Sequence, residues 1–291
     1  MPDGGRRGHA WPMVMLAAFL ALAVWMFGGA ITSAEPHSSA GVGGSRQAAG
    51  SGESVDPGEL VAAETPEGED AAVPADVVRP AASDTVSDTT PDAAAVARAG
   101  TRGNAAHVDP AWASEQAART GIPLRALLGY AGAELAMRSE APGCRIGWST
   151  LAAIGRLESG HGTHGRSSLG DDGVARPAIL GPDLDGEQFD RIDDTDGGVL
   201  DGSPATDRAV GPMQFIPSTW QEWRADGNAD GIADPQQIDD VSLAAARYLC
   251  NSGDLSDPAA WRSAVFAYNH VDAYVDAVAA AASDYAERAR G

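Results

Sequence analysis

Apolar residues recur at helical spacing in the stretch LAAIGRLESGHG, residues 151–162. The glycines at 160 and 162 end the predicted helix, so Glu158 lies in its last turn. There the helix dipole disfavours a negative charge, and with apolar neighbours the carboxyl pKa is expected to rise, as a general acid requires. The alternative is a solvated glutamate at a helix end. The apolar residues sharing one face are Trp148, Leu151, Ile154 and Leu157.

Proline, aspartate and glycine mark the ends of further predicted helices. The first of them ends at Gly121, and the second stops before Pro142-Gly143. Ser218 and Gln221 fit a capping box. The predicted starts are Asp109-Pro110, Ile122-Pro123, Pro217 or Ser218, Asp239 or Asp240 as a cap, Asp257-Pro258, and a position after His270 for an alanine-rich helix that runs to near Glu287.

Between Gly160 and Val210 the helical period disappears. Turn pairs such as Asp196-Gly197 and Asp201-Gly202 predict a small β-hairpin or irregular lobe whose aspartates are solvated turn residues. Residues 107–291 are thus expected to form one mainly α domain with a small irregular or β-hairpin lobe, long enough for a single core.

The first part of the chain has a different composition. Residues 1–31 carry Arg6 and Arg7 ahead of a long apolar run, which predicts a signal peptide or a retained signal-anchor helix. Residues 32–106 are rich in Ala, Pro, Gly, Ser and acidic residues, which predicts a disordered acidic tether. The domain is therefore expected outside the cytoplasm, either membrane-anchored or secreted.

The net charge and the two cysteines limit the possible partners and the compartment of the protein. The formal net charge is −21, which makes nucleic acid an unfavourable partner because its phosphates are also negative. Cys144 and Cys250 have no metal-type spacing and are expected to form a disulfide in an oxidising compartment, the alternative being two buried thiols.

Two more stretches carry candidate chemistry. AVGPMQFIPSTW, residues 209–220, presents Gln214 after a Gly-Pro turn, and FAYNH places Tyr268 and Asn269 at an exposed helix end. An amide, a phenol and a carboxyl, with aromatic rings for stacking, suit a sugar site. The candidate stacking residues are Trp148, Phe215, Trp220 and Tyr268.

With GRLESGHG, GPMQFIPSTW and AYNH in this order, the chain resembles the lytic murein transglycosylases, particularly the membrane-bound B type and its actinobacterial relatives. The resemblance implies a lysozyme-like fold that cleaves the β-1,4 bond between N-acetylmuramic acid and N-acetylglucosamine in peptidoglycan. It places the catalytic role on Glu158. It implies substrate contacts by Ser159, Gln214, Phe215, Tyr268 and Asn269, although Phe215 also suits the cleft wall or core.

A single carboxylate agrees with this reaction. Hydrolytic glycosidases usually use two carboxylates, whereas a transglycosylase can use the muramoyl C6 hydroxyl as its nucleophile and form a 1,6-anhydro end. The alternatives are a hydrolytic muramidase with an aspartate from the 171–201 lobe, and a non-catalytic peptidoglycan-binding scaffold. The expected partners are peptidoglycan strands, the cytoplasmic membrane through residues 1–31, and cell-wall enzymes that the sequence does not identify.

A second motif indicates calcium. Asp226, Asn228 and Asp230 stand at positions 1, 3 and 5 of a loop with Gly231 at position 6, as in a calcium loop. Gln237 replaces the glutamate at position 12, so either Asp239 or Asp240 closes a longer loop or the affinity for calcium is low. The B-type family has a similar loop. An unoccupied turn is the alternative, and the chemistry itself needs no cofactor. The expected ligands are Asp226, Asn228, Asp230, Ile232, Asp234 and Asp240.

The histidines of HGTH, His161 and His164, are expected to be polar loop residues. Glycines beside them remove the rigid backbone that a zinc site requires, so no metal is expected there.

Overall fold

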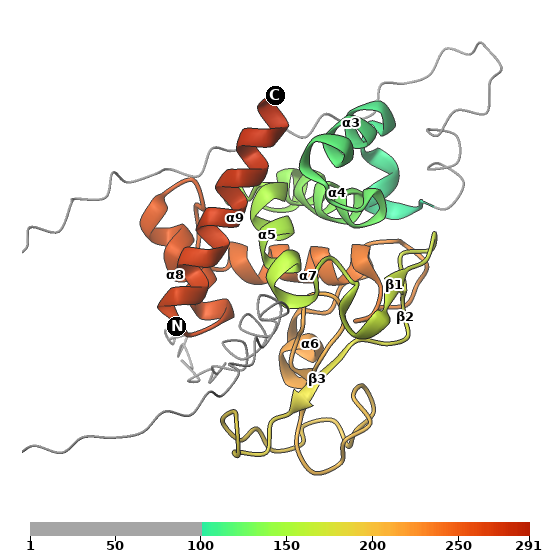
Figure 1. The fold of residues 1–291 in the computed structure, drawn as a ribbon, viewed down its shortest axis with the longest axis vertical. Helices are drawn as coiled ribbons and strands as arrows, with labels where there is room; N and C mark the ends of the chain where they lie inside the picture. Colours follow the sequence, from blue (N-terminus) through green and yellow to red (C-terminus); the bar gives the residue numbers. More distant parts are fainter. Residues whose placement is uncertain (1–100) are drawn as a thin grey trace, which may run out of the picture.

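The computed structural model describes residues 101–291, so the predicted segment 1–31 and most of the predicted tether lie outside the described residues. The described part is mainly α-helical, as the sequence predicted, with two short two-stranded antiparallel sheets (Figure 1). Its helices are η1 (Gly103–His107), α3 (Pro110–Thr120), α4 (Leu124–Glu140), α5 (Trp148–Ser159), η2 (His164–Arg166), α6 (Pro217–Trp223), α7 (Ile238–Cys250), α8 (Pro258–Tyr268) and α9 (Asp272–Arg290). Its strands are β1 (Ser168–Leu169), β2 (Ala175–Arg176), β3 (Leu180–Asp183) and β4 (Arg208–Val210).

Most helices begin and end at the Asp-Pro and glycine positions that the sequence predicted. The Asp109 carboxylate accepts a hydrogen bond from the Trp112 N–H at 2.9 Å, and Asp257 does the same for Ala260 at 2.8 Å. In both helices proline stands at the first position, where its missing N–H costs nothing. Gly121 ends α3 in the left-handed conformation that glycine adopts without strain.

Two predicted caps are wrong. Helix α6 is capped by Ile216 with no side-chain hydrogen bond, so Ser218 and Gln221 form no capping box. Helix α7 is capped by Gln237, whose Oε1 accepts from the N–H groups of Asp239 and Asp240 at 2.6 and 2.9 Å. Neither aspartate caps the helix because each carboxylate has another partner.

The core is built by three helices at the centre of the molecule, α4, α5 and α7 (Figure 1). Helix α4 packs against α7 and α5, α9 packs along α5, and α3 contacts α4 and α9. The predicted apolar face of α5 lies inside this core, because Trp148, Leu151 and Ile154 are each fully buried. The helix that carries Glu158 is therefore held from several sides.

Helix η1 begins inside the last residues of the predicted tether. Ala105 of η1 is 1% exposed and lies so close to α4 that a Cβ on Gly132 would stand 2.8 Å from its nitrogen. The folded domain thus starts a few residues before position 107.

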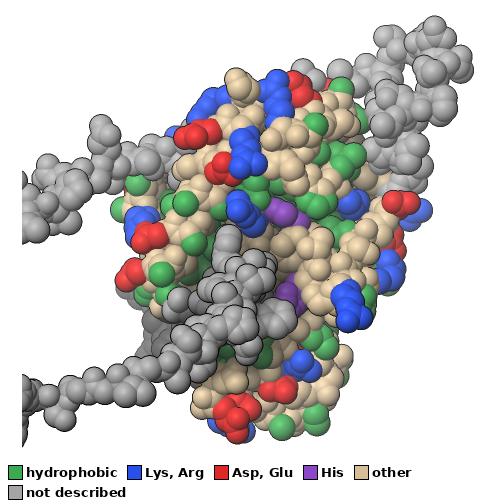
Figure 2. Space-filling view, in the orientation of Figure 1, with side chains coloured by type: hydrophobic (Ala, Val, Ile, Leu, Met, Phe, Trp, Pro, Cys, Tyr) green, Lys and Arg blue, Asp and Glu red, His purple; other side chains and the backbone are tan. Residues whose placement is uncertain are grey.

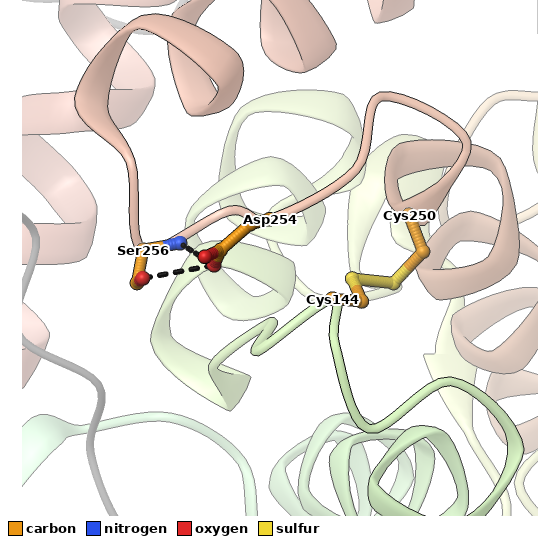
Figure 3. Close-up of a disulfide and its surroundings, with 4 residues drawn as sticks. All are labelled: Cys144, Cys250, Asp254 and Ser256. Carbon is orange, nitrogen blue, oxygen red and sulfur yellow. Dashed lines mark hydrogen bonds between the residues drawn. A yellow bond between two sulfur atoms is a disulfide. The ribbon is translucent and has the colours of Figure 1, made fainter.

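The predicted disulfide joins Cys144, in the connection before α5, to Cys250 at the end of α7, 106 residues later (Figure 3). The loop that follows Cys250 is anchored to the same connection, because the Leu255 N–H donates to the Cys144 carbonyl at 2.7 Å. Within this loop, Asp254 accepts hydrogen bonds from the N–H and hydroxyl of Ser256 (Figure 3).

Residues 160–210 form the predicted small lobe. Strand β1 pairs with β2, and β3 pairs with β4, both antiparallel. A small second cluster of Leu184, Phe189, Ala209 and Ile216 supports the lobe. Its aspartates behave as turn residues, since one carboxylate oxygen of Asp194 accepts from three successive backbone N–H groups, those of Asp196, Gly197 and Gly198.

Within residues 101–291, none of the helices combines the length and apolar character needed to cross a bilayer.

Candidate active site

Glu158 lies in the last turn of α5 and is only 2% exposed. Its Oε1 accepts a hydrogen bond from the Tyr274 hydroxyl at 2.5 Å, while its buried Oε2 has no hydrogen-bond partner among the described residues. Burial raises the pKa of this carboxyl to about 8, and the Tyr274 hydrogen bond lowers it in part. The pKa of Glu158 is thus raised, as the sequence predicted. Its main cause is burial, whereas the sequence analysis named the helix dipole first.

Tyr274 is a site residue that the sequence did not single out. It belongs to the first turn of α9, is buried, and reaches the carboxylate across the interface between α5 and α9. The sequence signal is weak: Tyr274 is one of two tyrosines in an alanine-rich helix and follows AYNH by a few residues. Nothing in the spacing indicates that this helix lies against Glu158.

Ser159 connects the end of α5 to the loop that carries Gln214. Its hydroxyl donates to the Pro212 carbonyl at 2.7 Å and accepts from the Gly162 N–H at 2.8 Å. The side chain is 2% exposed. Both contacts are with the protein's own backbone, so the visible role of Ser159 is to hold the two motifs together.

Gln214 lies in a tight turn between β4 and α6. Its backbone adopts a φ of 49°, and its side-chain amide donates to the Gly211 carbonyl at 2.9 Å. The amide oxygen lies against β3, where a Cβ on Gly181 would approach it to 2.9 Å. Glycine in β3 is therefore what gives the Gln214 side chain its space.

Tyr268 and Asn269 end α8 as predicted, but the helix end is buried, with each residue 5% exposed. The Tyr268 hydroxyl donates to the Met213 carbonyl at 2.7 Å, in the same turn that carries Gln214. Its pKa is raised, first by burial and then by the charge of Glu158. The side-chain oxygen of Asn269 is buried without a partner among the described residues.

The three sequence motifs thus meet in space. Ser159, which precedes the 211–215 turn in the sequence, and Tyr268, which follows it, both donate hydrogen bonds to carbonyl groups of this turn. Phe215 lies behind them at 1% exposure, in edge-to-face contact with Trp220 and Tyr268. It packs the turn against α8.

The expectation that aromatic rings offer a stacking surface is wrong. Trp148, Phe215, Trp220 and Tyr268 are between 0% and 5% exposed. Each fills the core and supports the motifs, because a ring enclosed by protein on both faces has none left for a sugar.

The predicted calcium loop is closed by Asp240. Asp239 is unavailable because it forms an ion pair with Arg125, whereas Asp240 accepts from the N–H groups of Gly227 at 2.7 Å and of Asp234 at 2.9 Å. Asp240 is fully buried, and burial raises the pKa of its carboxyl to about 7.

The other predicted ligands hold the loop together through hydrogen bonds from its own backbone. Asp226 accepts from the N–H groups of Asp230 and Gly231, and Asp230 accepts from that of Ile232. Asp234 accepts from the N–H of Gln236. Among the described residues, Asp226, Asp230, Asp234 and Asp240 do not form a group of three or more carboxylates whose oxygens lie within 4.8 Å of one another. Calcium binding by this loop therefore stays a prediction.

One other acidic group stands out among the described residues. Asp194, Asp196 and Asp207 have carboxylate oxygens within 4.8 Å of one another. Asp207 accepts from the N–H and hydroxyl of Thr195, and Asp196 accepts from the N–H of Leu200. Turn formation accounts for their positions.

The two histidines of HGTH differ in their exposure to solvent. His164 is exposed, but His161 is 8% exposed and its ring lies between two tyrosine hydroxyls.

No family model, curated protein or solved structure matches this chain. The function therefore has to be argued from the site.

Proposed function

We propose that this protein is a lytic transglycosylase of peptidoglycan with a lysozyme-like fold, in which Glu158 acts first as acid and then as base. The observation that carries the proposal is the buried Glu158 carboxyl, whose pKa of about 8 keeps it protonated at neutral pH. A general acid must hold its proton at the working pH.

Because only one carboxyl oxygen of Glu158 accepts a hydrogen bond from Tyr274, the two oxygens have different roles in the proposed reaction. Oε1 accepts from the phenol, so the transferable proton resides on Oε2, the oxygen without a protein partner. In the reaction, Oε2 gives this proton to the glycosidic oxygen as the bond to C1 breaks, with the sugar acetamido oxygen assisting at C1. The C6 hydroxyl then attacks C1, releases the acetamido oxygen, and returns its proton to Glu158, which leaves a 1,6-anhydromuramoyl end.

Transglycosylation is favoured over hydrolysis by what surrounds the acid. The two causes of the pKa shift of Glu158 are burial and the hydrogen bond from Tyr274. The buried lobe aspartates, Asp201 and Asp207, are engaged in hydrogen bonds to their own turns. A hydrolase would need a second carboxylate within about 10 Å of the acid.

The other residues of the motifs have supporting roles in this proposal. Gln214 and Asn269 supply amide groups for the sugar, while Ser159, Phe215 and Tyr268 hold the turn that carries Gln214. Peptidoglycan strands are the partner, nucleic acid is not, and residues 1–31 carry the domain across or to the cytoplasmic membrane. Ca²⁺ held by the 226–240 loop would have a structural role.

The test is mass spectrometry of purified peptidoglycan digested with the full-length protein. We expect anhydromuropeptides from the wild type, none from Glu158→Gln, and wild-type products from Glu115→Gln, the same substitution at an exposed position of α3. Products with reducing ends would make the protein a hydrolase. Binding to peptidoglycan without any product would make it a scaffold.

A further inference from the structure

His161 has no part in the proposed reaction, yet it is the most enclosed histidine of the described residues. Its backbone has a φ of 63°, between two glycines that also have positive φ. This conformation is unfavourable for a residue with a side chain and persists only where the surroundings impose it. The His161 N–H donates to the Gly155 carbonyl at 2.9 Å, which closes the end of α5.

The imidazole joins three helices. Its Nδ1 lies 3.2 Å from the hydroxyl of Tyr130 in α4, and its Nε2 lies 2.9 Å from the hydroxyl of Tyr285 in α9. The His161 ring is inclined at 56° to the Tyr130 ring and at 54° to the Tyr285 ring, with centroid distances of 5.8 and 5.9 Å. Gly155 of α5 leaves the space that the Tyr130 hydroxyl occupies, since a Cβ there would lie 2.1 Å from it.

A neutral imidazole suits this position because it donates through one nitrogen and accepts through the other. Burial, and secondarily the charge of Arg156, lowers the pKa of His161 to about 4. Two charged groups beside the Tyr285 ring are Arg156 of α5, whose guanidinium lies over that ring, and Asp284 of α9, which pairs with Arg156 and Arg288. Around neutral pH the bridge between the tyrosines is therefore intact.

Two of these helices, α5 and α9, also carry Glu158 and its hydrogen-bond donor. Helix α5 carries Glu158 three residues before His161, and α9 carries Tyr274, which donates to Glu158. Any sliding of α9 along α5 changes the Tyr274–Glu158 distance. We propose that His161 is a positioning residue: by bonding Tyr130 and Tyr285 it fixes α9 against α5 and so holds the Tyr274 hydroxyl on the Glu158 carboxylate. This role rests on the proposed function, but its structural part can be measured without substrate.

The experiment is a double-mutant cycle read out by the titration of Glu158. In full-length protein labelled with ¹³C at the glutamate carboxyls, Glu158→Gln identifies the Glu158 signal. Tyr274→Phe is expected to raise the midpoint by about one pH unit, the value of a hydrogen bond to a charged group. His161→Phe is expected to raise it by at least half as much, and the double variant no further than Tyr274→Phe alone, because both act through one bond.

Three controls separate positioning from general packing. His161→Gln keeps a donor and an acceptor and should return the midpoint to the wild-type value, and His164→Phe, in the exposed part of HGTH, should leave it unchanged. Tyr285→Phe removes one hydroxyl with little change of volume, and should raise the midpoint even if His161→Phe does not fold. A wild-type midpoint in folded His161→Phe or Tyr285→Phe, or additive shifts in the cycle, would overturn the proposal.

Activity on the same variants adds a second readout. In His161→Phe we expect kcat to fall about tenfold and KM to stay within twofold of wild type. The reason is that this substitution disturbs Glu158 and leaves the contacts with the sugar unchanged. A change in KM alone would count against positioning. If the wild type releases no product, the proposed function fails, and the titration cycle still decides the role of His161.

Discussion

At the scale of single residues, the character of Glu158 comes from its burial. The carboxyl is 2% exposed, has one phenol donor, and keeps one oxygen without a protein partner. The sequence indicated Glu158 because a helix ends beside it, and the structure confirms that α5 ends at Ser159. It could not indicate Tyr274 or the tyrosine partners of His161, since those contacts join residues more than 25 positions apart.

The raised pKa of Glu158 has a consequence for stability. Its pKa is about 8 in the folded protein against 4.5 ordinarily, so the folded state binds the proton more tightly, and stability falls as pH rises from about 4.5 to 8. Glu158→Gln does not titrate. We expect the variant to match the wild type at pH 4 and to be more stable by about 4 kcal/mol at pH 8.

Urea unfolding at both pH values measures this difference. The titration of His161 is common to both proteins and cancels. Parallel stability profiles from pH 4 to 8 would mean that the carboxyl is not desolvated.

At the scale of elements, helix ends marked by Asp-Pro or glycine were predicted well, because these signals act within a few residues. The ends of α3, α4, α5 and α8 follow them. The caps of α6 and α7 were wrong. At α7, Asp239 bonds to Arg125 and Asp240 to the preceding loop, so tertiary partners outweighed the local preference for aspartate as a cap.

Packing of α4 on α5 depends on the absence of a side chain at Gly155. A Cβ there would lie 2.1 Å from the Tyr130 hydroxyl, so Gly155→Ala should destabilise the protein by about 1–3 kcal/mol through overpacking. Gly143→Ala is the matched control, because a Cβ there meets nothing within 4 Å.

Chemical denaturation of both variants tests this. We expect the control to change stability by less than about 0.5 kcal/mol. Equal effects of the two substitutions would show that Tyr130 moves aside without cost.

At the scale of the whole molecule, the 226–240 loop ties the start of the domain to its centre. The Asn104 N–H in η1 donates to the Gly227 carbonyl at 2.9 Å, and a Cβ on Gly227 would lie 2.3 Å from the Asp239 carbonyl of α7. An ion held in this loop would therefore stabilise the entire domain. Basic and acidic side chains are interspersed on the visible part of the face seen in Figure 2.

We expect Ca²⁺ to raise the free energy of unfolding by about 3 kcal/mol at a hundredfold excess over its dissociation constant. Thermal unfolding with Ca²⁺, with Mg²⁺ and with chelator measures this. Asp226→Asn, at the first loop position, should abolish the Ca²⁺ effect, and Asp185→Asn, an exposed lobe residue, should retain it. A wild-type melting temperature that does not respond to Ca²⁺ would leave the loop a simple turn.

The sequence by itself determined the mainly helical class, most helix boundaries, the Cys144–Cys250 disulfide and the position of Glu158 at a helix end. These depend on periodicity, punctuation and residue type, which act over short distances or need no geometry. Only the tertiary structure decided that α9 lies along α5, that Tyr274 meets Glu158 and His161 meets Tyr285, and that the aromatic residues of the motifs are buried. Helix neighbours are chosen by the packing of all faces together, and the pKa of a carboxyl depends on how completely that packing excludes water.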